Sequence, residues 1–343
     1  MGCEILAIAP RDDFSFKLEE LGCKFVHIPI DNKGANPIKD LSLFFNFIRI
    51  YKKYKPDMVL HYTIKPNTYG SLACKALGIA CISNVSGLGT VFIRKGWVYQ
   101  LAKILYRISF LVPQRVFFQN NDDRQLFIDL NLVKDSRTGI LPGSGINTAL
   151  YRPVTYKKHF PFRFLLIARL LNDKGIAEFA NASKILQEKG YEIECKLLGF
   201  YDRESVYNIS REDIAMWSEK GYINFIGESK DVFIQINEAD CVVLPSYREG
   251  TPRSLLEAMA LEKPIIGTDV PGCREVVEEG KNGYMCLSKS AESLADTMLK
   301  IYNLPEDKLI KMGKQGRLIA ETKFDERIVV ESYLKEIFGK KMS

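Results

Sequence analysis

Several patterns that mark common protein classes are absent from this sequence. None of its eight cysteines forms a C-x-x-C pair, so there is no zinc-site spacing or thioredoxin-like motif, and buried reduced thiols of a cytosolic protein are expected instead. No uncharged run is long enough for a membrane-spanning helix, and the opening residues, MGCEILAIAP, lack the basic lead and the apolar length of a signal peptide. No G-x-G-x-x-G follows a predicted strand, which disfavours a nicotinamide-dependent dehydrogenase. We therefore expect a cytoplasmic protein that neither spans a membrane nor is exported.

Acidic residues are scarce in one part of the chain. Residues 1–150 hold 19 basic and 12 acidic side chains, and residues 151–343 hold 29 and 30. Within the first half, residues 41–121 contain eleven lysines or arginines and a single acid, Asp57. Such a field attracts an anionic partner, either a phosphorylated substrate, nucleic acid or an anionic membrane surface, and the alternative is a merely solvated basic face. No recognised nucleic-acid-reading module accompanies it, so we expect no nucleic-acid partner.

Short apolar runs alternate with longer amphipathic segments through most of the chain. The predicted strands of the first half are 4–9, 24–28, 57–61, 80–85, 115–118 and 137–141, and the predicted helices are 14–21, 38–54, 67–77, 95–111 and 122–132. After a hinge at 142–155 the pattern restarts, with strands 162–168, 192–198, 223–226, 241–244 and 264–267. Apolar strands spaced by helices predict parallel sheets covered on both faces. The sequence therefore predicts an α/β protein with two Rossmann-like, doubly wound domains, 1–150 and 151–324, whose strands face a crevice with their carboxyl ends, and a last helix within 325–343 that packs back towards the first domain.

The stretch SYREGTPRSLLEAMA places two glutamates near one helix start. Glu249 lies in the loop after a buried strand, and Glu257 lies among apolar residues of the following helix, where an unpaired carboxylate is costly. Thr251 is expected to cap this helix, with Pro252 in its first position. Helix starts bind anions and carboxylates bind hydroxyl groups, so a nucleotide sugar fits both features.

Two cations follow the strand at 162–168. Arg169 ends that strand and Lys174 enters the next helix, within ARLLNDKG. Both are expected at the same crevice edge as the glutamates, where two positive charges neutralise a diphosphate leaving group without a metal ion.

These motifs together resemble the retaining glycosyltransferases of family 4, which have the GT-B fold. The resemblance rests on E-x(7)-E in EGTPRSLLE, on MALEKPIIGTDVPGCREVVEEGKNGYM after it, and on ARLLNDKG and INFIGESKDV, and it covers nearly the whole chain. It implies that Arg169, Lys174 and Glu249 are catalytic, with both cations on the donor diphosphate and no metal ion. It also implies the other contacts to a UDP-sugar: sugar hydroxyls to Glu249 and the N–H groups of Gly250 and Thr251, ribose to Glu257, and base and ribose to Gly199 and Gly227.

The resemblance is strongest to the branch that acts on polyprenyl-diphosphate-linked glycans in bacterial O-antigen, capsule and N-glycan synthesis. HYTIKPN and NVSGLGT match this branch, which implies that His61, Lys65, Asn67, Gly87 and Gly89 lie on the acceptor side. The basic aromatic stretch 91–112, which contains Trp97, Tyr99 and Tyr106, suits a helix at the inner face of the cytoplasmic membrane. Core packing of that helix is the alternative.

The chain also departs from the family pattern at its start. Family members begin with a strand, a glycine-containing loop and a helix ahead of the strand seen here as EILAIAP. We expect either that the first domain lacks its first strand and helix or that the sequence begins downstream of the true start. The expected activity is transfer of a sugar from a UDP-N-acetylhexosamine or UDP-hexose to a lipid-diphosphate-linked glycan. A non-catalytic sugar-nucleotide or lipid-carrier binder and a GT-B nucleotide-sugar epimerase are the alternatives.

Overall fold

The computed structural model describes residues 2–12, 14–31, 36–88, 96–202, 205–229 and 231–339. The chain divides into two compact units. Unit 1 consists of residues 1–118 and 124–139, and unit 2 of residues 119–123 and 140–343. The change of unit therefore falls at residues 139–140, earlier than the predicted 150–151, and the short segment 119–123 belongs to unit 2. The last helix, α14 (Glu326–Phe338), also belongs to unit 2.

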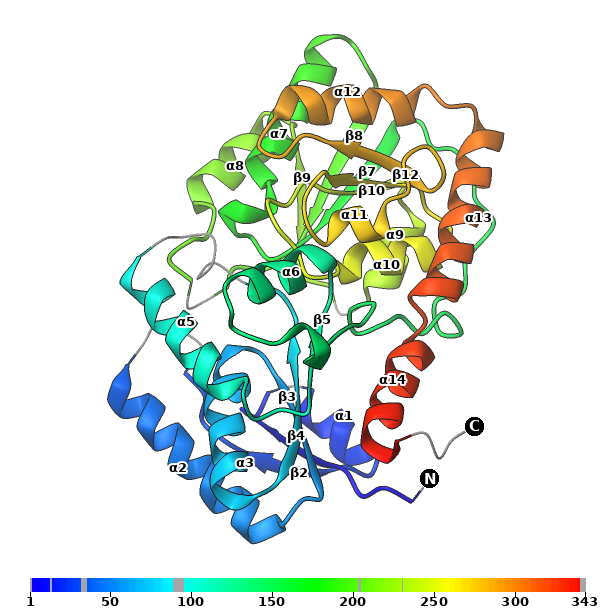
Figure 1. The fold of residues 1–343 in the computed structure, drawn as a ribbon. Helices are drawn as coiled ribbons and strands as arrows, with labels where there is room; N and C mark the ends of the chain where they lie inside the picture. Colours follow the sequence, from blue (N-terminus) through cyan, green and yellow to red (C-terminus); the bar gives the residue numbers. More distant parts are fainter. Residues whose placement is uncertain are drawn as a thin grey trace. The chain divides into compact units, whose positions relative to one another are not determined.

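The described part of unit 2 is built on a sheet of six parallel strands (Figure 1). Their order is β12 (Gly283–Cys286), β11 (Ile265–Thr268), β10 (Cys241–Leu244), β7 (Phe162–Ile167), β8 (Ile193–Leu198) and β9 (Asn224–Gly227). From β7 the chain adds β8 and β9 on one side and then β10 to β12 on the other. The switch point of the sheet therefore lies between β7 and β10, and in open α/β sheets ligands bind beside the carboxyl ends of the strands at this point.

Successive side chains of these strands point to opposite faces, and each face has its own core. Phe164 and Val243 contribute to one core, together with α7 (Ile176–Glu188), α8 (Arg211–Glu219) and α12 (Ala291–Tyr302). Leu165 and Val242 contribute to the other, together with α9 (Val232–Asn237), α10 (Arg253–Ala260) and α11 (Cys273–Val276). The helix α13 (Glu306–Lys323) supplies residues to both. Unit 2 is thus doubly wound, as predicted.

The described residues of unit 1 form two separate sheets rather than one. The strands β1 (Leu6–Ala9) and β2 (Lys24–His27) pair with each other, whereas β3 (Met58–Tyr62), β4 (Ala80–Val85), β5 (Arg115–Phe118) and β6 (Thr138–Ile140) form a separate sheet. The helices described in this part are α1 (Ser15–Glu20), α2 (Pro37–Tyr54), α3 (Ser71–Leu77), α5 (Trp97–Ser109) and α6 (Asn121–Asp129), which begins in unit 2. The predicted helix 67–77 is a π-helical turn, η1 (Pro66–Gly70), followed by α3.

Candidate active site

The sheet of unit 2 brings Lys174 and Glu249 together. Lys174 ends the turn η3 (Asn172–Lys174) after β7, and Glu249 lies in the loop after β10. These two loops leave the sheet at its switch point and are joined directly, because Tyr247 N donates to Asp173 O over 2.9 Å. The distance from Lys174 Nζ to Glu249 Oε1 is 2.6 Å, and the two side chains are 14% and 16% exposed. Each charge thus compensates the other in a largely buried setting.

This pair can serve a ligand that combines phosphate with hydroxyl groups. A lysine ammonium has three donors, so Lys174 can hold an anion while it remains bonded to Glu249. The carboxylate of Glu249 has acceptor positions beyond the one that Lys174 occupies, and carboxylates form strong, charge-assisted bonds with hydroxyl groups.

Arg169 lies at the same edge of the sheet, two residues beyond the end of β7. Its Nη1 is 3.3 Å from Asp202 Oδ2, and half of the arginine side chain is exposed. An exposed pair of this kind contributes little to stability. A phosphate group can therefore compete with Asp202 for the planar guanidinium, which binds phosphate in a bidentate manner.

Glu257 is held inside unit 2 by two neighbours. It is 9% exposed, and its Oε1 accepts hydrogen bonds from Tyr151 Oη and Arg253 Nε, each over 2.9 Å. Burial and then the neighbouring Glu257 raise the pKa of the Tyr151 phenol, which keeps Tyr151 a donor. Both bonds use Oε1, so they leave the predicted contact of this carboxylate with ribose hydroxyls untested.

Thr251 does not cap α10, and that prediction is wrong. The cap position is taken by Pro252, which makes no side-chain cap. Thr251 instead binds Gln119 twice, with its N–H donating to Gln119 Oε1 over 3.1 Å and its Oγ1 donating to Gln119 O over 3.2 Å. The cap was predicted from neighbouring residues alone, whereas Thr251 bonds to Gln119, which lies 132 residues earlier in the chain. The predicted contact of the Gly250 and Thr251 N–H groups with the donor sugar stays a prediction.

Gly199 and Gly227 lie side by side at the ends of β8 and β9. Gly199 N donates to Gly227 O over 2.8 Å. A Cβ atom on Gly199 would lie 1.9 Å from Ala168 O, so the neighbouring strand already requires a glycine here. Gly227 has a φ of +72° and open space where a Cβ would project. Their contact with a base or ribose stays a prediction.

The histidine predicted on the acceptor side is buried within unit 1. His61 is 3% exposed, its Nε2 lies 3.0 Å from Tyr51 Oη, and its Nδ1 lies 3.3 Å from Ser71 Oγ. A Cβ on Gly70 would lie 2.5 Å from His61 Nε2, so η1 packs directly on the ring. This position favours a structural role for His61.

Lys65 and Asn67, two other acceptor-side predictions, fall at or beside η1. Lys65 Nζ is 2.7 Å from Asp40 Oδ1, with side-chain exposures of 11% and 9%, so a carboxylate already balances its charge. Asn67 is fully buried and its Nδ2 donates to Asn84 O over 2.8 Å, while its Oδ1 has no hydrogen-bond partner among the described residues. Gly87 has a φ of +129°, and Gly89 lies outside the described residues.

The helix α5 shows which part of the basic aromatic stretch faces outward. Tyr106, predicted for the membrane interface, is 1% exposed and belongs to the core between β4, β5 and α6. The exposed face carries Ile104 and Ile108, followed by Leu111, with exposures of 57%, 47% and 62%. Arg107 is also exposed. The outward face is therefore aliphatic and basic, and it lacks Tyr106; residues 91–95 and the side chain of Trp97 lie outside the description.

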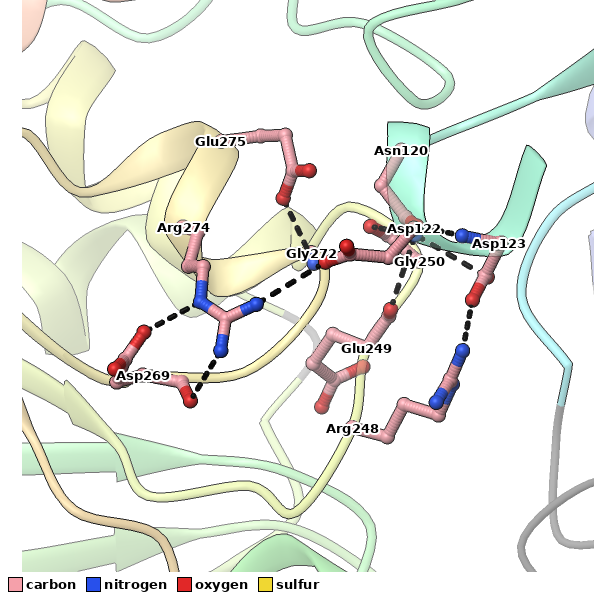
Figure 2. A network of polar contacts seen from close by, with 10 residues as sticks. All are labelled: Asn120, Asp122, Asp123, Arg248, Glu249, Gly250, Asp269, Gly272, Arg274 and Glu275. Carbon is pink, nitrogen blue, oxygen red and sulfur yellow. Dashed lines mark hydrogen bonds and ion pairs between the residues drawn. The ribbon is translucent and has the colours of Figure 1, made fainter. Parts of the chain in front are cut away.

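A group of residues that bind the loop of Glu249 was not predicted from the sequence. Asn120 and Asp123, from the segment that follows β5, contact residues 248–250, and Figure 2 shows them beside that loop. An asparagine between the predicted strand 115–118 and the predicted helix 122–132 is a capping signal that could have identified Asn120. No local signal points from that segment to Glu249, about 130 residues later in the chain.

Metal-binding clusters and membrane-spanning helices are both absent from the described ranges. There, no group of three or more His, Cys, Asp or Glu side chains is arranged to hold a metal ion. No helix in those ranges is both long enough and apolar enough to cross a bilayer.

Both halves of the chain match family models of glycosyl transferases. Residues 149–319 match the family described as glycosyl transferases group 1, and residues 4–120 match the family described as glycosyl transferase 4-like. The N,N'-diacetylbacillosaminyl-diphospho-undecaprenol alpha-1,3-N-acetylgalactosaminyltransferase of Campylobacter jejuni is 29% identical over 97% of this chain and 90% of its own length. The UDP-Gal:alpha-D-GlcNAc-diphosphoundecaprenol alpha-1,3-galactosyltransferase of Escherichia coli is 22% identical over 84% and 77%.

Solved structures share the fold. The crystal structure of Alr3699/HepE from Anabaena in complex with UDP-glucose matches with a TM-score of 0.80 at 17% identity, over 97% of this chain and 91% of that one.

Proposed function

Because this chain belongs to the group 1, family 4-like glycosyltransferases of GT-B fold, we propose that it transfers a sugar from a UDP-sugar to a glycan carried on a polyprenyl diphosphate. The observation that carries the proposal is the Lys174–Glu249 pair at the switch point of unit 2. It supplies a cation for the donor diphosphate and a carboxylate for the sugar hydroxyls, at the sheet edge where such ligands bind.

The charge that develops on the departing diphosphate is the largest electrostatic change in this reaction. Lys174 and Arg169 are the cations that this edge of the sheet offers to it, and they act more strongly in the transition state than in the ground state. We infer that no metal ion is needed, since these two charges match those of a diphosphate. Turnover that persists in excess EDTA supports this inference, and loss of turnover restored by Mg²⁺ or Mn²⁺ contradicts it.

Retention of the anomeric configuration follows from attack on the leaving-group face. The acceptor hydroxyl bonds to the anomeric carbon as the bond to the phosphate oxygen breaks, and its proton passes to that departing oxygen. Glu249 holds the sugar through its hydroxyl groups and need not act as a base. A coupling-constant measurement on the product tests this step: an inverted product contradicts it.

The acceptor class is supported by charge and by the relatives. The names of two curated relatives include a sugar linked to undecaprenol through a diphosphate. Residues 41–121 of this chain contain eleven basic side chains and one acidic side chain. We infer an anionic, lipid-linked acceptor of this kind, which is used in the synthesis of bacterial surface polysaccharides or glycans. The face of α5 with Ile104, Ile108 and Arg107 then serves as a contact with the inner leaflet of the cytoplasmic membrane, and we infer a cytoplasmic protein bound peripherally there.

The test is a panel of UDP-sugars assayed with a polyprenyl-diphosphate-linked sugar. We expect one donor to release UDP only when the acceptor is present and to extend the acceptor by one sugar. Donor binding without UDP release indicates a non-catalytic binder. Conversion of the donor sugar to its epimer without acceptor indicates an epimerase. Either outcome overturns the proposal.

A further inference from the structure

Asn120 uses both ends of its side-chain amide, and the two ends do different things. Its Oδ1 accepts from Asp123 N over 2.7 Å, which caps α6. Its Nδ2 donates to Gly250 O over 3.3 Å and lies 3.5 Å from Glu249 O, and it also contacts Asp123 Oδ2 at 3.2 Å. The side chain is fully buried. Asn120 therefore connects the start of α6 to the main chain of the loop that presents Glu249 (Figure 2).

Asp123 holds the same loop one residue earlier. Its carboxylate is completely buried, and Oδ1 accepts a hydrogen bond from Arg248 Nη2. Arg248 directly precedes Glu249, and its side chain reaches towards Asp123 in Figure 2 while that of Glu249 extends away. A buried ion pair is an expensive way to stabilise a fold, because apolar residues of similar volume do equally well or better. What the pair provides is a fixed direction for the chain at residue 248.

The opposite side of the loop is fixed as well. Glu249 N donates to Pro271 O over 3.2 Å. Gly272 packs so closely that a Cβ on it would lie 2.5 Å from Glu249 O and 2.4 Å from Gly250 O, and its own N–H is held by Glu275 Oε2 at 2.8 Å. The peptide groups around Glu249 are thus confined between the 119–123 segment and the 271–275 turn.

We propose that Asn120 and Asp123 are positioning residues for sugar transfer, which hold residues 248–251 so that the Glu249 carboxylate stands in the donor site. The inference rests on the proposed function. Capping alone does not account for Asn120, because a cap needs only an oxygen acceptor, and Asp, Ser or Thr supply that equally well. Only asparagine adds an N–H group directed at the carbonyls of Glu249 and Gly250. Loss of that N–H donor should lower the rate of sugar transfer and leave the affinity for uridine diphosphate unchanged.

Asn120→Asp separates the two roles. The variant keeps an oxygen to cap α6. It places a carboxylate oxygen against two carbonyl oxygens of the loop and against the Asp123 carboxylate that directs Arg248. We expect the turnover number to fall at least roughly ten-fold with the best donor of the panel, and the affinity for UDP alone to stay within about three-fold of wild type. Hydrogen exchange in peptides that cover residues 246–252 should accelerate, with other segments unchanged.

The matched control is Asn36→Asp. Asn36 caps α2 through the same atom, with Oδ1 accepting from the N–H groups of Ile38 and Lys39, and it is exposed. This variant should match wild type in turnover, UDP affinity and exchange.

A second pair of variants guards against a folding defect in the first. Asp123→Asn keeps the shape of the side chain and removes the charge that directs Arg248, whereas Glu188→Gln disturbs an exposed pair on α7, in which Glu188 Oε1 lies 3.8 Å from Lys184 Nζ. We expect the first to reproduce the effects of Asn120→Asp and the second to have none.

Wild-type turnover and wild-type exchange in both Asn120→Asp and Asp123→Asn would overturn the inference. A parallel loss of melting temperature and UDP affinity in both variants would also overturn the inference, because that result would assign Asn120 and Asp123 a purely structural role. The exchange measurement needs no donor, so it judges the positioning of the loop even if wild type turns over no UDP-sugar. That last outcome counts against the proposed function alone.

Discussion

Lys174 and Glu249 come from loops that are 75 residues apart in the chain, and each is the other's charge partner. Both are largely buried, so removal of either leaves the charge of the other uncompensated. The sequence predicted that both residues lie at the crevice edge of one sheet. It could not predict their contact, because that depends on β7 and β10 being neighbours.

Neutral replacements of this pair should separate its two functions. Lys174→Met should weaken UDP binding and lower turnover by roughly 100-fold or more, the effect of removing one preorganised donor to developing charge. Glu249→Gln should lower turnover comparably and leave UDP affinity nearly unchanged, since UDP carries no transferable sugar. Calorimetry with UDP and steady-state UDP release measure the two effects.

Lys184→Met is the control for these variants. Lys184 Nζ lies 3.8 Å from Glu188 Oε1 in an exposed helical pair of the same unit. Its replacement should therefore change neither UDP affinity nor turnover. Near-native turnover of Lys174→Met or Glu249→Gln contradicts the assigned roles.

Glu257 yields a separate prediction about the nucleotide. If this carboxylate accepts from the ribose hydroxyls, wild type should bind UDP at least roughly ten-fold more tightly than the 2′,3′-dideoxy analogue, because charge-assisted hydrogen bonds contribute about 1.5–3 kcal/mol. Glu257→Gln should reduce that ratio towards one. Equal ratios in wild type and variant show that Glu257 serves only Tyr151 and Arg253. The sequence identified Glu257 as a carboxylate that needs a partner, but not Tyr151, which lies 106 residues earlier.

At the scale of secondary-structure elements, apolar strands were the most predictable part of the fold. The bounds of β4, β5 and β10 agree with the predicted 80–85, 115–118 and 241–244, because each is a short apolar run next to clear helix or turn signals. The strand β12 was not predicted, because its sequence GYMC has no branched residue and begins at a glycine. The residues of β12 have little preference for a strand by themselves, and pairing with β11 stabilises the strand.

The helix α5 gives a prediction at this scale. Ile104→Glu with Ile108→Glu should weaken binding to vesicles that contain anionic lipid by at least roughly ten-fold, because burial of an aliphatic side chain contributes about 1.5–3 kcal/mol. Arg107→Gln should reduce the preference for anionic over neutral vesicles, since each basic residue near the surface contributes about 1 kcal/mol. Co-sedimentation with vesicles of phosphatidylglycerol and phosphatidylcholine measures both effects.

Leu287→Glu with Val206→Glu is the matched control. Both residues are exposed aliphatic side chains of unit 2, with exposures of 65% and 85%, and their replacement should leave vesicle binding unchanged. Equal binding by the α5 variant and wild type would assign the exposed face of α5 a different role.

At the scale of the whole molecule, the two edges of the sheet in unit 2 carry different groups of polar residues. The carboxyl edge carries Lys174 and Glu249. Near the opposite edge lies a closed polar cluster, in which buried Asp240 accepts from Tyr156 Oη at 2.7 Å and from Arg163 N at 2.7 Å. The neighbouring Lys263 is 2% exposed and donates to Asn237 O over 2.8 Å.

This cluster predicts a pH dependence of stability. Burial lowers the pKa of Lys263 to about 8, although the nearby Asp240 opposes the shift, whereas a lysine of the unfolded chain titrates near 10.5. Between these values the unfolded chain holds more protons at Lys263 than the folded protein does, so the contribution of this residue to the free energy of unfolding rises with pH. Relative to Lys263→Met, wild type should gain stability from pH 8 to pH 10.5 and show no such change below pH 7. Urea unfolding at several pH values measures the difference, and a constant difference contradicts the prediction.

The division of the chain into units was only partly predictable. Two α/β units follow from the restart of the strand pattern, and the restart lies close to the observed boundary at residues 139–140. The membership of residues 119–123 in unit 2 had no local signal, because it depends on contacts with residues 248–251. Such long-range contacts define much of the candidate site, which explains why motifs located its charged residues and not the side chains that hold them.

The most direct test of the donor site is a crystal structure of the protein with the UDP-sugar that it turns over fastest. We predict a diphosphate within ion-pair distance of Lys174 and Arg169, and sugar hydroxyl groups bonded to the carboxylate of Glu249. A nucleotide bound elsewhere, with Lys174 and Glu249 contacting only each other, would contradict the central claim that this pair forms the donor site.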